Sequence, residues 1–301
     1  MRVIHSIESF AKQSRPTNLT IGMFDGMHLG HQALINRLVE KDGHCVVLTF
    51  SNHPAQVLYQ KKISLLTSLS HRLALFEQKK VDTVILLPFT NEFSKQSATS
   101  FLTLLKQHLR FTHLILGHDS AIGQGREGDR PHLFSIANSL NFSLEYIEPI
   151  QVEKMVVSSS EIRKKIESGD LKTTSRLIGR DYSIFARVAR GAGKGQILGF
   201  QTANLPVEGL CLPPLGVWAV KVMVDNQIYW AVANLGHAPT LHVHRPLCLE
   251  VHLLSCQKQF YGKEMEVIFL KHLRSERRFA TLEMLKKQIK KDIFHAKQFF
   301  D

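Results

Sequence analysis

Ten residues near the amino terminus carry the strongest chemical signal: the run 22–31 reads Gly-Met-Phe-Asp-Gly-Met-His-Leu-Gly-His. A β-prone apolar run, 19–21, precedes it, and 32–39 has the apolar spacing of a helix. At a strand-to-helix turn, free N–H groups and the helix dipole favour an anion, and glycine lets a phosphate approach closely. His28 and His31 would add side-chain donors. The run therefore predicts a site that holds a nucleoside triphosphate and transfers an adenylyl group.

A second run, 157–163, reads Val-Ser-Ser-Ser-Glu-Ile-Arg and has the character of a helix start. Ser158, Ser159 and Ser160 could cap free N–H groups and bind phosphate oxygens. Arg163, one turn into the helix, could reach the same anion with its planar guanidinium. Alone, this run would indicate only a capped helix. Beside the first run, it predicts a second helix start on the other side of the triphosphate.

Two loops that follow strand-like runs also gather polar residues. The segment 49–54, Thr-Phe-Ser-Asn-His-Pro, contains His53, which either lines the site or is an ordinary loop residue. The segment 117–129 places Asp119 and Arg126 in a long loop with several glycines. Because ligands of parallel sheets bind at the carboxyl ends of the strands, we expect both loops to border one site.

The second half of the chain carries a different set of polar motifs. The run 190–195, Arg-Gly-Ala-Gly-Lys-Gly, could wrap phosphates, although such a loop alone is often only a flexible hairpin. The run 199–204, Gly-Phe-Gln-Thr-Ala-Asn, follows it. The candidate ligands for ATP in the first of these runs are Gly191, Gly193, Lys194 and Gly195.

The run 249–254, Leu-Glu-Val-His-Leu-Leu, contains a carboxylate within a strand-like segment. On a strand, Glu250 and His252 point the same way. We expect them on the inner face of a barrel, where a carboxylate is costly unless it is used or paired. The alternative is an acid that forms a salt bridge at a sheet edge.

The elements that must position the first motifs alternate between strand and helix. Such alternation predicts a doubly wound α/β domain, with a parallel sheet and helices on both faces. The expected strands are 19–24, 44–50, 83–89, 113–117 and 143–148, and the expected helices are 29–41, 68–79, 98–108 and 131–140.

After about residue 177 the pattern changes to strand-like runs separated by turns. These runs, followed by a helix at 282–299, predict a small antiparallel β-barrel with a C-terminal helix. We therefore predict two domains, 1–177 and 178–301. The expected barrel strands are 182–190, 216–224, 228–235, 247–254 and 264–269.

The composition is that of an ordinary globular protein. The 301 residues are 44% hydrophobic and 21% charged, which suits two packed cores, and no apolar run approaches a membrane span. The first residues lack a secretory apolar core and the four cysteines lie far apart, so we expect a cytoplasmic protein. The net charge of +12 could indicate nucleic acid, but many bases lie in the C-terminal helix as a solvated amphipathic face. We therefore expect no nucleic-acid partner and no membrane.

Together, the two motif sets resemble the bacterial bifunctional riboflavin kinase/FMN adenylyltransferases, also called FAD synthetases. The resemblance rests on Gly-x-Phe-Asp-Gly-x-His-x-Gly-His and Ser-Ser-Ser-x-Ile-Arg, then on Gly-Phe-x-Thr-Ala-Asn and Glu-x-His-Leu-Leu, in that order. It implies a nucleotidyltransferase domain and a six-stranded type of kinase barrel. Such a protein makes FMN from riboflavin and ATP, and then FAD from FMN and ATP with release of pyrophosphate. The chain departs from the family pattern at Ser120, Ile122, Gln201 and Ala238.

The resemblance also implies a role for each matching residue. In the transferase, it implies ATP binding at Gly22, Phe24, Asp25, Gly30, Ser158, Ser159 and Ser160, catalysis by His28, His31 and Arg163, and FMN binding at His53, Asp119 and Arg126. In the kinase, it implies that Glu250 is the base that takes the 5′-hydroxyl proton of riboflavin. It also implies that Arg274 contacts the flavin, and that Thr202 and Asn204 hold Mg²⁺ with ATP.

Three other interpretations are open at this stage. The chain could retain only one of the two activities. The His-x-Gly-His turn also marks class I aminoacyl-tRNA synthetases, so an RNA-binding protein is a second alternative. A flavin-binding regulatory protein is the third, although binding alone needs neither a base such as Glu250 nor a metal ligand such as Thr202. The expected partners are riboflavin, FMN and ATP, and the expected state is a monomer or weak oligomer.

Overall fold

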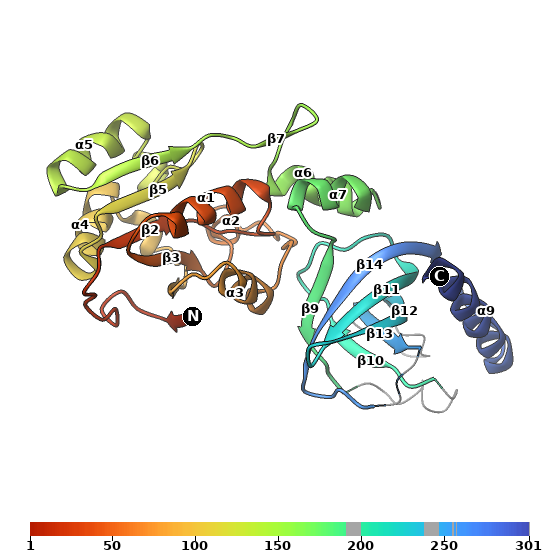
Figure 1. Ribbon diagram of the computed structural model, residues 1–301. Helices are drawn as coiled ribbons and strands as arrows, with labels where there is room; N and C mark the ends of the chain where they lie inside the picture. The colour runs from red at the N-terminus through yellow and green to blue at the C-terminus, as the bar shows by residue number, and fades with distance from the viewer. Residues whose placement is uncertain (191–199, 238–246, 255, 257, 301) are drawn as a thin grey trace. The chain divides into compact units, whose positions relative to one another are not determined.

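The computed structural model describes residues 1–190, 200–237, 247–254, 256 and 258–300. The chain folds into two compact units, whose helices and strands are labelled in Figure 1. The first unit comprises Met1–Ile63 and Arg72–Ser159, and the second comprises Ser64–His71 and Ser160–Asp301. Within the described residues, no helix is both long enough and apolar enough to cross a bilayer.

The first unit is built on a six-stranded sheet in the order β1-β4-β3-β2-β5-β6, in which every adjacent pair is parallel. From β2 the chain adds β3 and β4 on one side, and it then crosses over to place β5 on the other side. The loops that follow β2 and β5 therefore flank the crevice where ligands of such sheets bind. The strands are β1 (Arg2–Ile4), β2 (Thr17–Ile21), β3 (His44–Phe50), β4 (Thr83–Leu87), β5 (His113–Gly117) and β6 (Ser143–Ile147).

Helices connect these strands, and several begin at a side chain that caps them. Ser97 accepts a hydrogen bond from a backbone N–H in the first turn of α4, and Asp129 does the same for α5. The helices are α1 (Leu29–Glu40), α2 (Pro54–Leu58), α3 (Leu69–Gln78, which begins in the second unit), α4 (Ala98–Leu109) and α5 (Arg130–Leu140). Short elements are η1 (Phe93–Lys95), η2 (Gln124–Arg126) and the hairpin of β7 (Gln151–Val152) and β8 (Met155–Val156).

The helices cover both faces of the sheet, because strand residues alternate between two apolar clusters. On β3, Val46 and Leu48 belong to a cluster with residues of α4 and α5. Val47 points to the opposite face, where its cluster includes residues of α1 and α3. The predicted doubly wound α/β fold is confirmed. The three-residue edge strand β1 is too short to show a pattern, and the sequence did not predict it.

The second unit contains a six-stranded antiparallel sheet in the order β10-β13-β12-β11-β14-β9. Past the end of β9, the N–H of Ala189 donates to the carbonyl of Asn204 on β10 at 2.8 Å, so the sheet nearly closes on itself. The predicted antiparallel barrel is confirmed, with the short β10 added. The strands are β9 (Ser183–Arg187), β10 (Ala203–Pro206), β11 (Gly216–Val224), β12 (Gln227–His237), β13 (Leu247–Leu253) and β14 (Glu264–Arg274).

The two faces of strand β13 differ in a way that corrects one expectation. Leu249 and Val251 are fully buried and fill the barrel interior. Glu250 and His252 alternate with them and share their face with Val232, which packs against helix α9 (Leu282–Phe300) outside the barrel. The expectation that Glu250 lies on the inner face was therefore wrong. It lies on the outer face, because the apolar row of the strand occupies the interior.

The second unit also includes two helices and a segment that precede the barrel in the sequence. The helices are α6 (Ser159–Glu167) and α7 (Leu171–Ile178). The segment Ser64–His71 joins the second unit through Leu65: its N–H donates to the Gly209 carbonyl at 2.8 Å, and its carbonyl accepts from the N–H of Cys211 at 2.7 Å. The limits 1–177 and 178–301 for the catalytic domains stay a prediction.

Candidate functional site

The turn that follows β2 has a strained backbone. Phe24 and Met27 adopt positive φ angles of 53° and 42°, and both side chains are buried. A left-handed conformation costs a residue other than glycine roughly 1–3 kcal/mol, and it persists where the surrounding structure requires it. Such strain clusters at binding sites, and this turn lies at the crevice flanked by β2 and β5.

His28 ends this turn and caps helix α1. Its Nδ1 accepts a hydrogen bond from the N–H of His31 at 3.4 Å, so a neutral His28 carries its proton on Nε2. The two imidazole rings are stacked, with their centroids 3.6 Å apart. A Cβ atom on Gly30 would lie 3.3 Å from the His28 ring, which explains the glycine between the histidines.

His31 is held in its neutral form. Burial lowers its pKa well below the ordinary value, and the positive potential of His28 and then Arg72 lowers it further. Its Nδ1 is buried without a hydrogen-bond partner. Its ring and that of Phe24 are arranged edge to face, with their centroids 5.3 Å apart. At neutral pH the histidine pair can therefore act toward an anion through N–H donors rather than as two full charges.

The structure brings the two signatures of the first half together. The hydroxyl of Ser159, at the start of α6, donates to the carbonyl of Asp25 in the turn at 3.0 Å. Ser159 is thus held against the turn that carries the histidines, and Asp25 is buried there. Ser158 immediately precedes this contact, and Ser160 begins the part of α6 that belongs to the second unit.

Arg163 lies one turn further along α6, within the second unit. Its Nε donates to the carbonyl of Ser64 at 2.7 Å, and its own carbonyl lies 3.8 Å from the thiol of Cys211. Arg163 thus joins the segment Ser64–His71 to the barrel side of the chain. Its contact with a triphosphate stays a prediction.

The loops expected to hold FMN lie at the carboxyl ends of strands, and their polar groups have local partners. His53 caps α2, with Nδ1 accepting from the N–H of Ala55 at 3.1 Å. After β5, the guanidinium of Arg126 donates to the carbonyl of Asp119 at 2.6 Å, and the Asp119 side chain is exposed. Ile122 packs into the apolar core, so it does not offer a wall to a ligand.

Two features of this end of the sheet were not predicted. The side chain of Arg72, on α3, is buried and hydrogen-bonds to backbone carbonyls in the turn and at the end of β3. The only signal in the sequence is a cation directly before the apolar run 73–76 of this helix. The second feature is an aromatic cluster in which Phe89 and Phe93 are partly exposed and meet Phe50 edge to face.

In the barrel, the register of three strands aligns three polar side chains. Glu250 on β13 lies opposite Asn204 on β10 and opposite Asn234 on β12. Directly opposed residues project on the same face, with Cβ atoms about 4.5–5.5 Å apart. A carboxylate thus stands between two amide side chains on the outer face of the barrel. Thr202 precedes Asn204 by two residues, just before β10 begins.

The other residues predicted for the kinase site are Arg274, which the structure describes, and a group that lies outside the described residues. Arg274 forms a bidentate ion pair with the buried carboxylate of Asp292 on α9, with N···O distances of 2.8–3.1 Å. Arg274 therefore fixes the C-terminal helix to the barrel, and its contact with a flavin stays a prediction. The predicted phosphate ligands Gly191, Gly193, Lys194 and Gly195, and the substituted position Ala238, lie outside the described residues.

The donor set near Glu250 suits Mg²⁺. Within the described residues, no group of three or more His, Cys, Asp or Glu side chains could hold a metal by itself. Mg²⁺ is usually held by only one or two protein oxygens together with substrate phosphates. The hydroxyl of Thr202 and the amide oxygen of Asn204 are oxygen ligands of this kind.

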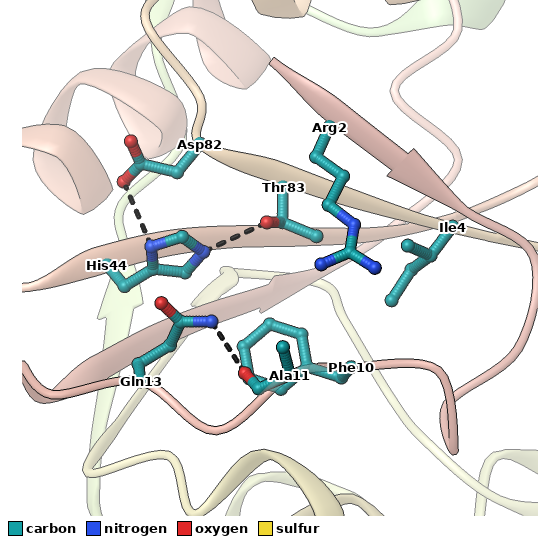
Figure 2. A pocket seen from close by; sticks show the side chains of 8 residues that line it. All are labelled: Arg2, Ile4, Phe10, Ala11, Gln13, His44, Asp82 and Thr83. Atoms are coloured by element: carbon teal, nitrogen blue, oxygen red, sulfur yellow. Dashed lines mark hydrogen bonds and ion pairs between the residues drawn. The ribbon is translucent and has the colours of Figure 1, made fainter.

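A cavity of about 250 Å³ lies elsewhere in the first unit, at the amino ends of β1, β3 and β4. Figure 2 shows His44 between Asp82 and Thr83, with Nε2 2.9 Å from the Thr83 hydroxyl and Nδ1 3.7 Å from the Asp82 carboxylate. Burial lowers the pKa of His44 despite Asp82, so the ring is neutral at pH 7. This cavity is at the end of the sheet opposite to the turn 22–31.

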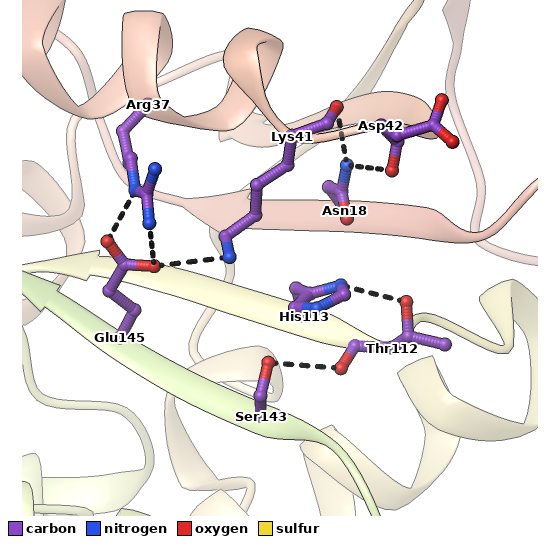
Figure 3. Close-up of polar contacts among 8 residues, drawn as sticks. All are labelled: Asn18, Arg37, Lys41, Asp42, Thr112, His113, Ser143 and Glu145. Carbon is purple, nitrogen blue, oxygen red and sulfur yellow. Dashed lines mark hydrogen bonds and ion pairs between the residues drawn. The ribbon is translucent and has the colours of Figure 1, made fainter.

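A polar cluster near the same end holds helix α1 in place (Figure 3). Arg37 on α1 and Lys41, directly after the end of α1, both contact the Glu145 carboxylate of β6, at 2.6 Å and 3.4 Å. The hydrogen bond from Arg37 and the nearby cations lower the pKa of Glu145. The amide of Asn18 on β2 donates to the carbonyls of Lys41 and Asp42 at the end of the helix. These contacts fix the helix whose first turn carries the histidines.

Comparisons with known proteins find a match for each half of the chain. The family model described as FAD synthetase matches residues 10–161, and that described as riboflavin kinase matches residues 178–300. A bifunctional riboflavin kinase/FMN adenylyltransferase of Haemophilus influenzae is 34% identical, with all of both chains covered. One from Escherichia coli is 33% identical over 100% of this chain and 97% of its own.

A solved structure of similar fold also covers nearly the whole chain. The crystal structure titled as a macrolide-efflux protein from Streptococcus pneumoniae matches with a TM-score of 0.80, covering 98% of each chain at 24% identity. At that identity the likeness concerns the fold alone. The family follows from the matches to the two domain models and to the full-length relatives: this chain belongs to the bifunctional riboflavin kinase/FMN adenylyltransferases.

Proposed function

We propose that the barrel phosphorylates riboflavin to FMN, and that the α/β unit adenylylates FMN to FAD with release of pyrophosphate. The chain has the domains of an enzyme with both activities, a riboflavin kinase and an FMN adenylyltransferase. The observation that supports the assignment of sites best is the separation of the motifs. The stacked histidines lie in the first unit, and the Asn204–Glu250–Asn234 row lies in the second.

For adenylyl transfer, the terminal phosphate oxygen of FMN attacks the α-phosphate of ATP. The proposed work of this chain is to align the two phosphates and to stabilise charge on the departing pyrophosphate. His28 and His31 would donate from the first turn of α1, and Ser159 and Arg163 from α6. Supporting this, Ser159 is already bonded to the turn that carries the histidines. No covalent enzyme intermediate is needed.

For the kinase, the 5′-hydroxyl of riboflavin is a poor nucleophile until a base accepts its proton. We propose that Glu250 is this base. Its position on the outer face supports the role, because a substrate can reach that face and cannot reach the packed interior. Asn204 and Asn234 would orient the carboxylate from both sides.

We propose that Thr202 and Asn204 hold Mg²⁺ with the phosphates of ATP. The metal would neutralise phosphate charge during transfer. In the α/β unit, the partly exposed Phe89 and Phe93 offer an apolar surface for the flavin ring, which would compensate for Ser120 and Ile122.

The remaining proposals concern the setting of the enzyme. Its partners would be riboflavin, FMN and ATP, without a nucleic acid or a membrane. It would act in the cytoplasm, where thiols stay reduced, because its four cysteines lie far apart in the sequence and do not form a disulfide framework. It would be a monomer or a weak oligomer.

The test is to incubate the purified chain with riboflavin, ATP and Mg²⁺, and to separate the flavins by chromatography. Formation of FMN and then FAD is expected. FMN alone would indicate a silent transferase, and FAD only from supplied FMN would indicate a silent kinase. Absence of both products would overturn the proposal. A gel shift with tRNA that weakens as salt rises would instead support the RNA-binding alternative.

A further inference from the structure

Arg72 joins two neighbouring strand ends of the first unit. Its Nη1 donates to the carbonyl of Met23 at 2.6 Å, and its Nη2 donates to the carbonyl of Phe50 at 2.7 Å. Met23 belongs to the turn that carries the histidines, and Phe50 ends β3. A single guanidinium therefore fixes the turn after β2 to the end of the adjacent strand.

This cation is placed at a considerable cost. Its side chain is only 2% exposed, and its Nε is buried without a hydrogen-bond partner. Burial lowers the pKa of Arg72 to about 10, although the nearby Asp25 raises it, so the group is charged at neutral pH. A buried charge of this kind, bonded to the turn that carries the histidines, is a candidate for a functional role.

The charge of Arg72 acts on the site. The groups that perturb the His31 imidazole electrostatically are His28 and Arg72, which both disfavour its protonated form. The carboxylate of Asp25 interacts electrostatically with Arg72 and favours its charged form. Met23, whose carbonyl Arg72 binds, directly precedes the strained Phe24, and the strained Met27 lies four residues after Met23.

We propose that Arg72 is a positioning residue for adenylyl transfer: it holds the strained turn 22–31 against the end of β3 and sets the electrostatic environment of His31. This inference rests on the proposed transferase function of the first unit. It assigns Arg72 no contact with substrate, because its nitrogen atoms are engaged or enclosed within the protein.

Two variants separate the two parts of the role. Arg72→Lys keeps the positive charge, but a single ammonium lacks the fork that spans both carbonyls. Arg72→Met removes the fork and the charge. We expect both variants to lower kcat/KM for FAD formation, Arg72→Met by about 100-fold, which is typical when reacting groups are displaced by about 1 Å. FMN formation by the same polypeptide should stay unchanged. Lys95→Met, which removes an exposed cation of the same unit, is the matched control.

The second readout is the titration of the His31 imidazole, followed by NMR in the full-length protein. We expect the pKa of His31 to rise in Arg72→Met and to stay close to the wild-type value in Arg72→Lys and Lys95→Met. The acid limb of the FAD-forming rate should move to higher pH in Arg72→Met alone. A residue that only supports the fold would not move this limb.

Three results would overturn the proposal: unchanged FAD kinetics in both variants, equal losses of FMN and FAD formation, or an unmoved His31 titration in Arg72→Met. If Arg72→Met does not fold, the kinetics of Arg72→Lys decide. A wild-type protein that forms no FAD from FMN and ATP would defeat the proposed function instead. A shifted His31 titration would then still support the electrostatic role of Arg72.

Discussion

The two candidate sites of this chain are positioned by different means. The transferase site depends on a turn with strained backbone, a histidine that caps a helix and a buried arginine that ties two strand ends. The kinase site depends on the register of an antiparallel sheet, which aligns Asn204, Glu250 and Asn234 without unusual backbone. The first arrangement should be sensitive to small backbone changes. The second should be sensitive mainly to the chemistry of its side chains.

The largest effect is expected for Glu250→Gln. The change keeps the size and hydrogen-bonding capacity of the side chain but removes its basicity, so the kinase rate should fall about 100- to 10,000-fold. FAD formation from supplied FMN should persist, and riboflavin should still bind. Both rates and riboflavin fluorescence quenching can be measured on one preparation. A nearly normal kinase rate would make Glu250 structural and place the base elsewhere on the barrel.

His28→Ala and His31→Ala should produce the opposite selectivity. Each loss of an anion-stabilising donor is expected to cost about 2–4 kcal/mol in the transition state, or roughly 30- to 900-fold in FAD formation. FMN formation should remain nearly intact. Parallel assays of the two activities provide the measurement. If both activities decline together, the histidines support the fold rather than the chemistry.

Gly30→Ala tests how sensitive the strained turn is. The added Cβ would lie 3.3 Å from the His28 ring and would displace it by a few tenths of an ångström. We expect FAD formation to fall about 10-fold, because transfer depends on alignment. The melting temperature should hold or rise, since alanine favours a helix over glycine by about 1 kcal/mol. An unchanged rate would show that the ring has room to move.

The smallest effect concerns pH and the second unit. His71 is buried beside Phe185 and Glu266, and burial, aided by Arg180, lowers its pKa to about 3. The unfolded chain therefore binds a proton that the folded chain excludes between about pH 3 and 6.5, so stability falls as pH falls through that window. Between pH 7 and 6 the loss should be below about 1 kcal/mol. Urea unfolding of wild type and His71→Phe should show a shallower pH dependence in the variant.

Much of the fold could be predicted from the sequence, because apolar periodicity reports strands and helices directly. The five strands β2 to β6 of the first sheet match their predicted runs to within a few residues. The strands β1 and β10, with three and four residues, are too short to show a period. The outer position of Glu250 could have been predicted from the sequence. Leu249 and Val251 alternate with polar residues, and the apolar row of a barrel strand fills the interior.

The site was predictable only where its residues stand together in the chain. The histidine pair and the serine run are local signatures, and the contact between Ser159 and Asp25 is consistent with their expected pairing. The role of Arg72 could not be predicted, because its partners are backbone carbonyls. Every residue has such a group, so the sequence does not show which ones Arg72 contacts. Asn234 gains its place beside Glu250 from strand register, which requires the folded sheet.

The segment Ser64–His71 has a consequence for how such enzymes could be rearranged by recombination. It is encoded inside the first domain, yet it hydrogen-bonds to Gly209 and Cys211 and belongs to the second unit. The chain thus passes between the units at 63/64, 71/72 and 159/160 rather than once. A single genetic crossover that exchanged one barrel for another would pair the new barrel with a foreign Ser64–His71. Viable chimaeras should therefore carry this short segment along with the barrel, so that an exchange of barrels requires crossovers at all three places rather than at one.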